Sequence, residues 1–370
     1  MMRVLHVVTS LGQGGMENGV CNLAIGLRAQ NIETHIACLE HRGAFSERLP
    51  EQSLVTTLGK KNGFSLRAVW TLARTLRSVR PHVVHTHNLG PLIYASLATF
   101  GGKMYPILHG EHALLADWER KPNRIRQRRI LYRSCRSIHT VSQAQVAELI
   151  PIAGSQDRIH AIANGVDTDQ FQPGDRSIAR KKLGLPLDAT IVGLIGRFGA
   201  FKRHDVLLSA FEELAKDEAS IHLLLIGSGG SEEQRIRALA DASSFRSRIH
   251  FTGFMADPTV GYHALDLLAI PSINEGMSNA ALEAMSCEVP VIANIDCGHE
   301  QIITHGKDGI ITDITTSSLL KIAIESVLAS PKVMVQLRLN ARATIFERFT
   351  LTRMLSEYAA LYARCVGRSN

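Results

Sequence analysis

The sequence has no apolar run long enough to span a lipid bilayer, for which about 18–20 residues are needed. We also expect no secretory leader, because the apolar start, Met1–Val8, is short and runs into a glycine-rich turn, which is typical of a first buried strand. The cysteines show no paired spacing that would indicate disulfides or a zinc site: Cys21, Cys38, Cys135, Cys287, Cys297 and Cys365. We therefore expect reduced thiols and a cytoplasmic protein.

Repeats of solenoid period and low-complexity tracts are also missing, so the chain has the composition of an ordinary globular protein. Of its 370 residues, 45% are hydrophobic and 20% are charged. This length is too great for one ordinary domain and suits two α/β domains of roughly 150–200 residues each.

The net charge of +7 is concentrated in one stretch. Between Asp117 and Arg136 there are eight Lys or Arg and two acidic residues, whereas the rest of the chain has 33 basic and 32 acidic residues. A nucleic-acid-binding protein would be expected to spread its basic residues over a longer face with interleaved aromatic residues. We therefore expect no nucleic-acid partner.

Short apolar runs alternate with amphipathic stretches, which is the pattern of βαβ units. The predicted strands are 4–9, 35–39, 82–86, 106–109, 137–141, 190–195, 221–226, 249–252, 266–270 and 289–293. The predicted helices are 16–30, 66–80, 89–100, 142–150, 206–216, 232–242 and 279–285.

The pattern is interrupted at the turn-rich Gln172–Asp175 and then restarts. We predict an α/β fold of two Rossmann-like, doubly wound domains, residues 1–171 and 172–349, with a C-terminal helix (350–370) crossing back onto the first. Two such halves imply a cleft between them, and ligands of such sheets bind beyond the carboxyl ends of the strands.

Two loops that follow predicted strands contain residues suited to phosphate. Gly12–Glu17, with Gly14 and Gly15, opens a helix, and glycines there let backbone N–H groups approach an anion; a tight turn without a ligand is an equal alternative. In Gly196–Lys202, Arg197 can hydrogen-bond a diphosphate in bidentate fashion and Lys202 can add a point charge. Taken alone, two solvated surface cations are the simpler interpretation of this second loop.

A third motif, Glu275–Ala284, leads from a strand into a helix. Ser278 and Asn279 supply an N-cap and free N–H groups for an anion. Glu275 and Glu283 can grip sugar hydroxyls at one end and ribose hydroxyls at the other. The alternative, a capped helix with a solvated glutamate, is disfavoured by the complete E-x7-E frame.

These motifs together resemble glycosyltransferase family 4. The resemblance spans nearly the whole chain, in order and at family-like spacing, and is completed by these residues: Asn164–Asp167, Phe171, Pro173, Pro290–Ala293, Gly298–Glu300, Asp308 and Gly309. It implies the GT-B fold, a nucleotide-diphosphate-sugar donor, retention at the anomeric carbon and no metal or other cofactor. Within this family the sequence resembles exopolysaccharide-type sugar transferases.

The same resemblance implies a role for each matching residue. Arg197 and Lys202 would neutralise the donor diphosphate, Glu275 would contact the sugar, and Glu283 the ribose. The N–H groups around Ser278 and Asn279, with Gly276 and Met277 beside them, would hold the donor, and Gly14 and Gly15 would line the site from the other domain. Glu288 departs from the family pattern, in which glycine usually precedes the P-V-I-A segment.

The histidines after two strands of the first domain are a separate group. In the resemblance, His109 faces the donor sugar, so we expect a catalytic role for it, with Glu111 and His112 on the acceptor side. His85 and His87 can be structural or catalytic. The spacing H-x-x-H without a helical H-E-x-x-H frame does not indicate a metal site. Asp167-Thr168-Asp169 mimics a D-x-D metal motif, but its setting indicates a structural turn.

The basic stretch is interspersed with apolar residues such as Trp118 and Ile130. A solvated face is the usual interpretation of a charge run. A basic amphipathic helix can also bind an anionic membrane, with these residues as the candidate patch: Arg124, Arg126, Arg128, Arg129 and Arg133. A lipid-linked acceptor at the inner face of the membrane would explain such a patch.

The expected function is retaining, metal-independent hexosyl transfer from a nucleotide-diphosphate donor, most simply a UDP-sugar, to a glycan or lipid-linked acceptor in surface polysaccharide biosynthesis. Two alternatives remain. One is a sugar-nucleotide epimerase on the same fold, and the other is a degenerate sugar-nucleotide-binding partner in a polysaccharide assembly complex. The motifs recognise phosphates and ribose, which all nucleotide sugars share.

Overall fold

The computed structural model describes residues 1–51, 54–295 and 297–367. The chain forms two compact units, residues 1–164 with 351–370 and residues 165–350. In this division the turn-rich Gln172–Asp175 lies inside the second unit. Val166 forms a β-bridge to Thr350 there, and Phe171 packs its ring against Tyr262 at 5.9 Å between centroids.

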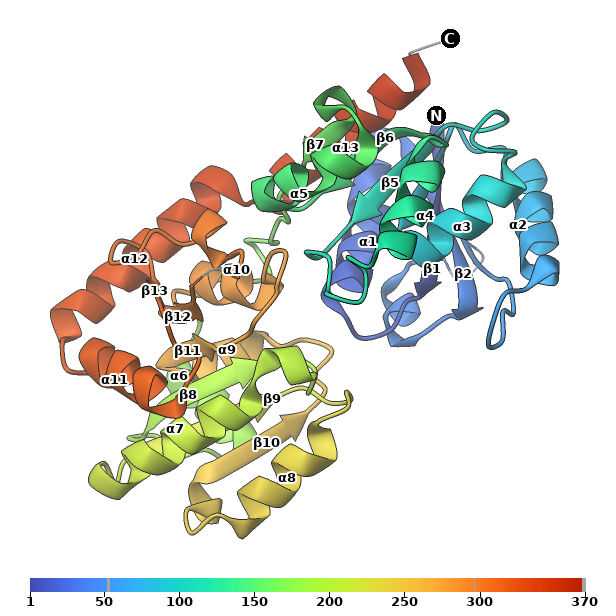
Figure 1. Cartoon of the computed structure of the whole chain (residues 1–370). Coiled ribbons are helices and arrows are strands. Elements are labelled where there is room, and N and C mark those ends of the chain that lie inside the picture. Colours follow the sequence, from blue (N-terminus) through green and yellow to red (C-terminus); the bar gives the residue numbers. More distant parts are fainter. Residues whose placement is uncertain (52–53, 296, 368–370) are drawn as a thin grey trace. The chain divides into compact units, whose positions relative to one another are not determined.

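The first unit is built on a parallel sheet of seven strands in the order β3-β2-β1-β4-β5-β6-β7 (Figure 1). The strands are β1 (Met2–Ser10), β2 (Ile32–His41), β3 (Val55–Thr57), β4 (Val83–His87), β5 (Ile107–Glu111), β6 (Cys135–Thr140) and β7 (Ile159–Ala161). The helices are α1 (Gly15–Gly26), α2 (Leu66–Val79), α3 (Leu89–Ala98), α4 (Pro122–Tyr132), α5 (Gln143–Ala153) and α13 (Leu351–Gly367).

Helices cover both faces of this sheet because the buried strands are apolar on both sides. On one face, Leu72 of α2 and Leu92 of α3 belong to one core with Leu5 of β1. On the other face, Leu361 of α13 shares a core with Val4 of β1. The C-terminal helix therefore packs within the first unit.

The second unit repeats the same winding, with six parallel strands in the order β10-β9-β8-β11-β12-β13. The strands are β8 (Thr190–Ile195), β9 (Ile221–Ile226), β10 (Ile249–Gly253), β11 (Leu267–Ile270), β12 (Val291–Asn294) and β13 (Ile310–Thr312). The helices are α6 (Arg176–Leu183), α7 (His204–Asp217), α8 (Glu233–Ala242), α9 (Thr259–Ala264), α10 (Asn279–Ser286), α11 (Ser317–Leu328) and α12 (Pro331–Arg348).

The predicted α/β class with two doubly wound sheets is confirmed. In each sheet the strand order reverses next to the first strand of its unit, so β1 neighbours β4 and β8 neighbours β11. Such a switch point leaves a crevice at the carboxyl ends of two adjacent strands, where ligands of doubly wound sheets bind. The short strands β3, β7 and β13 were not predicted, because three residues are too few to show a period.

Candidate functional site

In the second unit, the predicted donor residues gather at the switch point. Arg197 and Lys202 follow β8, and Glu275 follows β11, its neighbour in the sheet. Lys202 Nζ forms an ion pair with Glu275 Oε1. Arg197 is exposed, and in the described part of the chain it has no carboxylate partner. The fold therefore brings a bonded cation–carboxylate pair and a free guanidinium to one edge of the sheet.

The Glu275 carboxylate is buried, with its residue only 7% exposed. Burial alone would raise its pKa, but the charge of Lys202, helped by nearby His299, holds the pKa at about 2, against an ordinary value of 4.5. Glu275 is therefore an anion at neutral pH. His299 is fully buried, and its Nδ1 lies 3.1 Å from the Asn294 carbonyl oxygen.

Helix α10 begins beside this pair. The Ser278 hydroxyl accepts a hydrogen bond from the Ala281 amide at 3.4 Å, which is the predicted N-cap. Close packing holds the preceding loop in place: a Cβ at Gly298, where φ is +85°, would lie 2.7 Å from the Glu275 carbonyl oxygen. Only glycine fits there, so the backbone of Gly298 sets the position of Glu275.

Glu283 is the fifth residue of α10, about one turn into the helix, and a tyrosine fixes its carboxylate. The Tyr262 hydroxyl donates to Glu283 Oε2 at 2.7 Å, and Tyr262 is completely buried. Sequence reasoning missed Tyr262, because a single tyrosine in a short helix carries no motif. Burial and the neighbouring Glu283 charge hold the pKa of Tyr262 well above its ordinary value, so its proton remains available for this bond.

A second glycine-rich turn, Gly227–Gly230, was also missed, although its G-S-G-G pattern after β9 is visible in the sequence. The Phe198 amide donates to the Gly229 carbonyl at 2.8 Å, and a Cβ at Gly227 or Gly230 would overlap the backbone of Gly196 or Phe198. The two turns therefore pack backbone to backbone, and this contact fixes the loop that carries Arg197.

In the first unit, Gly14 is the N-cap of α1, as the glycine motif predicted. The Glu17 carboxylate folds back against Gly14, where a Cβ would overlap it. An anion of the chain itself therefore lies at the N-terminus of this helix. The roles of Gly14 and Gly15 toward a donor stay predictions.

His109 lies inside β5 and is completely buried. Its Nδ1 is 2.9 Å from the Thr86 hydroxyl and its Nε2 is 3.3 Å from Glu111 Oε1. Both ring nitrogens are therefore engaged within the unit, and a contact with a donor sugar would require one of them to be released. The catalytic role of His109 stays a prediction.

Glu111 is also buried and accepts further hydrogen bonds from Arg128 Nε at 3.1 Å and from the Tyr132 hydroxyl at 2.8 Å. Burial would raise its pKa, but His109 and Arg128 hold it at about 2. Glu111 of β5 therefore holds α4 against the sheet through its hydrogen bonds with Arg128 and Tyr132. Its neighbour His112 is half-buried and lies just beyond the strand, where a side chain can reach solvent.

The predicted membrane patch needs one correction. Arg128 has no exposed surface and forms ion pairs with both Glu111 and Glu119. It points into the unit, where it supplies the counter-charge for the buried Glu111 and the partly buried Glu119. Arg128 therefore cannot contact a membrane, whereas Arg126, Arg129 and Arg133 are exposed.

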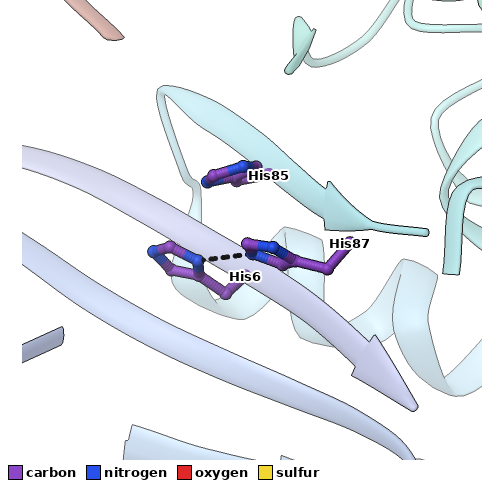
Figure 2. Close-up of side chains that lie close together, drawn as sticks. All are labelled: His6, His85 and His87. Carbon is purple, nitrogen blue, oxygen red and sulfur yellow. Dashed lines mark hydrogen bonds between the residues drawn. The ribbon is translucent and has the colours of Figure 1, made fainter. Parts of the chain in front are cut away.

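Beneath these residues lies a cluster of buried histidines that the sequence does not show as a group. His6 of β1 and His85 and His87 of β4 are drawn together in Figure 2, where the His6 and His87 rings are joined by a hydrogen bond of 3.0 Å. His87 Nδ1 also lies 2.9 Å from His112 Nε2, and His85 Nε2 lies 2.7 Å from His139 Nε2. Burial lowers the pKa of each of these histidines, so they are neutral imidazoles.

Two triads in this cluster offer nitrogen atoms within 4.8 Å of one another and are near enough to hold a metal ion: His6, His85 and His87, and His87, His112 and His139. Most of these nitrogens are already joined in ring-to-ring hydrogen bonds. His85 Nδ1 is also 2.8 Å from the Tyr362 hydroxyl of α13. The arrangement is a hydrogen-bonded network under the C-terminal helix, and the expectation of no metal cofactor stays a prediction.

Two local predictions concern turns. Asp167 Oδ1 accepts hydrogen bonds from the amides of Asp169 at 3.0 Å and Gln170 at 3.1 Å, so the D-x-D segment forms a turn. Glu288 has a φ of +58°, the left-handed region that favours glycine. The turn that the family closes with glycine is therefore kept here, with a glutamate in its place.

Comparisons with known proteins agree with this geometry. Residues 13–170 match the family described as Glycosyltransferase Family 4, and residues 175–344 match the family described as Glycosyl transferases group 1. Among solved structures, Anabaena HepE in complex with UDP-glucose is similar over 98% of this chain and 100% of its own, with a TM-score of 0.86 and 22% identity. Sucrose-phosphate synthase from Thermosynechococcus elongatus is similar over 99% of this chain and 100% of its own, with a TM-score of 0.83 and 20% identity. These likenesses show the GT-B fold.

Among curated relatives, a D-inositol 3-phosphate glycosyltransferase of Rhodococcus jostii is 31% identical over 61% of this chain and 54% of the relative. One of Mycobacterium bovis is 28% identical over 78% of this chain and 58% of the relative. The matched part thus spans a little over half the length of these relatives. The two family models together match nearly the whole chain, and the solved structures share its fold over almost its full length. The chain therefore belongs to the glycosyltransferases of the family 4 type.

Proposed function

We propose that the chain transfers a hexosyl group from a UDP-sugar to a glycan or lipid-linked acceptor in surface polysaccharide biosynthesis, with retention and without a metal. The observation that carries this proposal is the gathering of Arg197, Lys202, Glu275 and the capped start of α10 at the switch point of the second unit. The UDP donor is supported by the solved Anabaena protein, whose complexes contain UDP and UDP-glucose.

In the proposed reaction the donor diphosphate is the leaving group. Arg197, Lys202 and the positive end of the α10 dipole stabilise the charge that develops on it, which is electrostatic catalysis by preorganised groups. The acceptor hydroxyl attacks from the face that the diphosphate leaves, and a leaving phosphate oxygen takes its proton. The new bond joins the acceptor oxygen to the anomeric carbon, and the bond to the diphosphate oxygen breaks.

The ion pair between Lys202 and Glu275 has a role in this scheme. Without a donor, each side chain neutralises the other in a buried setting, where an unpaired charge would be costly. A bound diphosphate would share Lys202 and leave Glu275 free to accept hydrogen bonds from sugar hydroxyls. The pair therefore keeps both groups in place and ionised until the donor arrives.

The acceptor has a second candidate. The curated relatives named above are D-inositol 3-phosphate glycosyltransferases, so a phosphorylated cyclitol is a possible alternative to a glycan or lipid-linked sugar. Incubating the protein with UDP-glucose and either acceptor, and identifying the product by mass spectrometry, separates the two. The anomeric configuration of the product, read by NMR, tests retention.

Arg197→Ala tests the assignment of the diphosphate site. By analogy with loss of one oxyanion donor, we expect a loss of about 2–4 kcal/mol of transition-state stabilisation, measured as kcat/KM. Lys216→Ala on the exposed face of α7 is the matched control and should leave kcat/KM unchanged. Full activity of Arg197→Ala would contradict the assignment.

The two alternative functions predict other outcomes for the wild-type protein. Conversion of the UDP-sugar to an epimer without an acceptor would favour the epimerase. Intact donor binding without any turnover would favour a degenerate binding partner.

No helix in the described parts of the chain is both long and apolar enough to cross a membrane. A cytoplasmic location with peripheral contact at the inner face of the membrane is part of the proposal. It is supported by exposed arginines at the surface of the first unit and by the need to reach a lipid-linked acceptor.

A further inference from the structure

A second basic region lies outside the stretch that the charge count singled out. Between Glu51 and Glu111 the sequence contains no Asp or Glu, but it has seven basic residues: Lys60, Lys61, Arg67, Arg74, Arg77, Arg80 and Lys103. Outside the stretch from Asp117 to Arg136, basic and acidic residues are nearly equal in number. This near-balance conceals the second basic region, because the acidic residues that balance its charge lie in other parts of the chain. The region includes α2, β4 and α3.

Helix α2 is amphipathic with an unusual outer face. Ala68, Leu72 and Leu76 are buried against the core of the first unit. On the opposite side, Leu66 is 75% exposed and Trp70 is 58% exposed. Two large apolar side chains thus point to solvent from a helix that already buries a complete apolar stripe.

Arginines surround these exposed apolar side chains. Arg67, Arg74 and Arg77 are exposed, and none of them pairs with a carboxylate in the described residues. The Arg74 guanidinium lies 4.7 Å from the centre of the Trp70 ring. The outer face of α2 therefore carries unneutralised positive charge together with an aromatic ring.

The apolar surface continues next to α2. Phe64 is 59% exposed and stacks at 5.5 Å on Tyr94 of α3. The turn after α3 lies against the other end of α2, since the Tyr105 hydroxyl donates to the Leu76 carbonyl at 3.3 Å. Exposed apolar side chains also occur at this end of α3: Leu97, Phe100 and Met104. Figure 1 shows α2 beside α3 at the edge of the first unit.

We propose that this α2 face, defined by Phe64, Leu66, Arg67, Trp70, Arg74 and Arg77, docks on the surface of an anionic lipid bilayer. Aromatic and aliphatic side chains enter the headgroup boundary, and arginines around them bind anionic headgroups, which is how amphipathic surface helices bind membranes. Tryptophan is favoured at this boundary because its ring is amphipathic.

Exposed apolar side chains favour α2 over α4 as the membrane contact. In α4 and the loop before it, Arg128 is buried between two glutamates and Arg120 pairs with Glu148 at 2.8 Å. Arg126, Arg129 and Arg133 of the α4 region are exposed and have no carboxylate partner among the described residues either. The difference lies in the exposed large apolar side chains, of which Phe64, Leu66, Trp70, Leu97, Phe100 and Met104 lie on or beside α2, against Trp118 and Ile130 at α4. The inference rests on the proposed function in one respect: a lipid-linked acceptor would explain why the protein binds a membrane. Vesicle binding needs no donor, so the two can fail separately.

Tryptophan fluorescence can test the proposal directly, because the chain has two tryptophans and one lies at each basic surface: Trp70 in α2 and Trp118 before α4. Trp118→Phe leaves Trp70 as the sole reporter, and Trp70→Phe leaves Trp118. Both proteins are mixed with phosphatidylglycerol-containing vesicles that carry brominated acyl chains, which quench tryptophan at the lipid boundary. We expect vesicle-dependent quenching of Trp70. If Trp70 stays unquenched while the protein is bound, the proposal is overturned.

Charge removal gives an independent measure. Each cation near an anionic surface contributes about 1 kcal/mol, so Arg67→Gln with Arg77→Gln should lower vesicle partitioning roughly 30-fold at low salt. The matched control removes the same charge from exposed positions of α4, with Arg126→Gln and Arg129→Gln, and should change partitioning much less. Circular dichroism of both pairs verifies that they fold.

Three further results would contradict the proposal. The first is failure of the wild-type chain to bind anionic vesicles at low salt. The second is a loss of partitioning in the α4 pair as large as that in the α2 pair. The third is protection of Trp70 from acrylamide quenching in the lipid-free protein, which would show that a second copy of the chain covers this face.

Discussion

Arg128 provides the counter-charge for two carboxylates inside the first unit. Its guanidinium bonds Glu111 and Glu119, and the side chain is fully buried. Removing one partner of a buried ion pair leaves an uncompensated charge in a low-dielectric setting, which is strongly destabilising. The consequence here reaches further, because Glu111 also bonds His109 and Tyr132.

Arg128→Met should therefore lower the free energy of unfolding of the first unit by about 3–5 kcal/mol. The measurement is urea denaturation followed by circular dichroism. Arg129→Met, one residue along on the exposed face, is the control and should change stability by less than about 0.5 kcal/mol. Equal midpoints for the two variants would show that Arg128 does not stabilise the unit.

Glu275 gives the second unit an acid-sensitive contribution to stability. Its pKa is lowered from 4.5 to about 2, so this contribution is complete above pH 4.5 and disappears as pH falls toward 2. Lys202 is the principal cause of the lowering, against the opposing effect of burial.

Lys202→Met should raise the pKa of Glu275, because burial then acts without the opposing charge. The variant should be less stable than wild type at neutral pH, and the difference should shrink as pH falls below 4.5. Thermal midpoints of both proteins from neutral to acid pH measure this. The exposed Lys332→Met serves as control, and a Lys202 difference that stays constant with pH would contradict the account.

For single residues, the sequence predicts which side chains belong to the candidate site better than it predicts their burial and hydrogen-bond partners. Arg197, Lys202 and Glu275 are singled out by loops that follow strands together with the resemblance to glycosyltransferase family 4, and the structure places them at one sheet edge. The burial of Arg128 could not be predicted, because it depends on carboxylates 9 and 17 residues away in the chain. The role of Tyr262 could not be predicted for the same reason, because its hydrogen bond to Glu283 joins residues that are 21 positions apart and belong to no common motif.

Among the elements, α10 links the site to the core. It begins at the Ser278 N-cap beside Glu275 and ends just before Glu288, whose left-handed φ of +58° turns the chain into β12. A residue with a Cβ is strained in that region, by roughly 1–2 kcal/mol. The fold keeps the turn because Met285 and Val289 on either side are buried.

Glu288→Gly should raise the free energy of unfolding by up to about 1 kcal/mol, because glycine relieves the strain but gains freedom in the unfolded chain. Glu288→Ala separates the backbone effect from the side-chain effect, since alanine retains the strain. Thermal midpoints of the three proteins give the comparison. A glycine variant that is less stable than the alanine variant would mean that this conformation is not strained.

Element prediction succeeded where periodicity is long and failed where it is short. Apolar runs such as Ile221–Ile226 form the predicted strands, and α2 appears almost as expected from its helical spacing. The exposed apolar face of α2 was not recognised, because only the helix itself, over 66–80, was predicted and not which of its side chains are buried. Its lack of acidic neighbours is visible in the sequence, and regional charge counts would have found it.

At the scale of the whole molecule, the chain uses one winding twice. Each unit has a parallel sheet whose strand order reverses beside its first strand. The second unit places its predicted donor residues at that reversal, and the first places His6 and His85 on the two strands that meet there. The same topology thus carries different side chains in the two units: charged groups, which we propose bind an anionic donor, in one, and a neutral histidine network in the other.

The central claim is that the second unit binds a nucleotide-diphosphate sugar through Arg197, Lys202 and Glu283. It is tested by a thermal-shift panel of UDP, GDP, ADP and their common sugar forms, with Glu283→Ala as the comparison. A ligand at 100 times its dissociation constant stabilises the folded state by roughly 2.7 kcal/mol. The account predicts a shift with UDP and a UDP-sugar that is lost in Glu283→Ala; the absence of a shift with every nucleotide, or an equal shift in the variant, would contradict it.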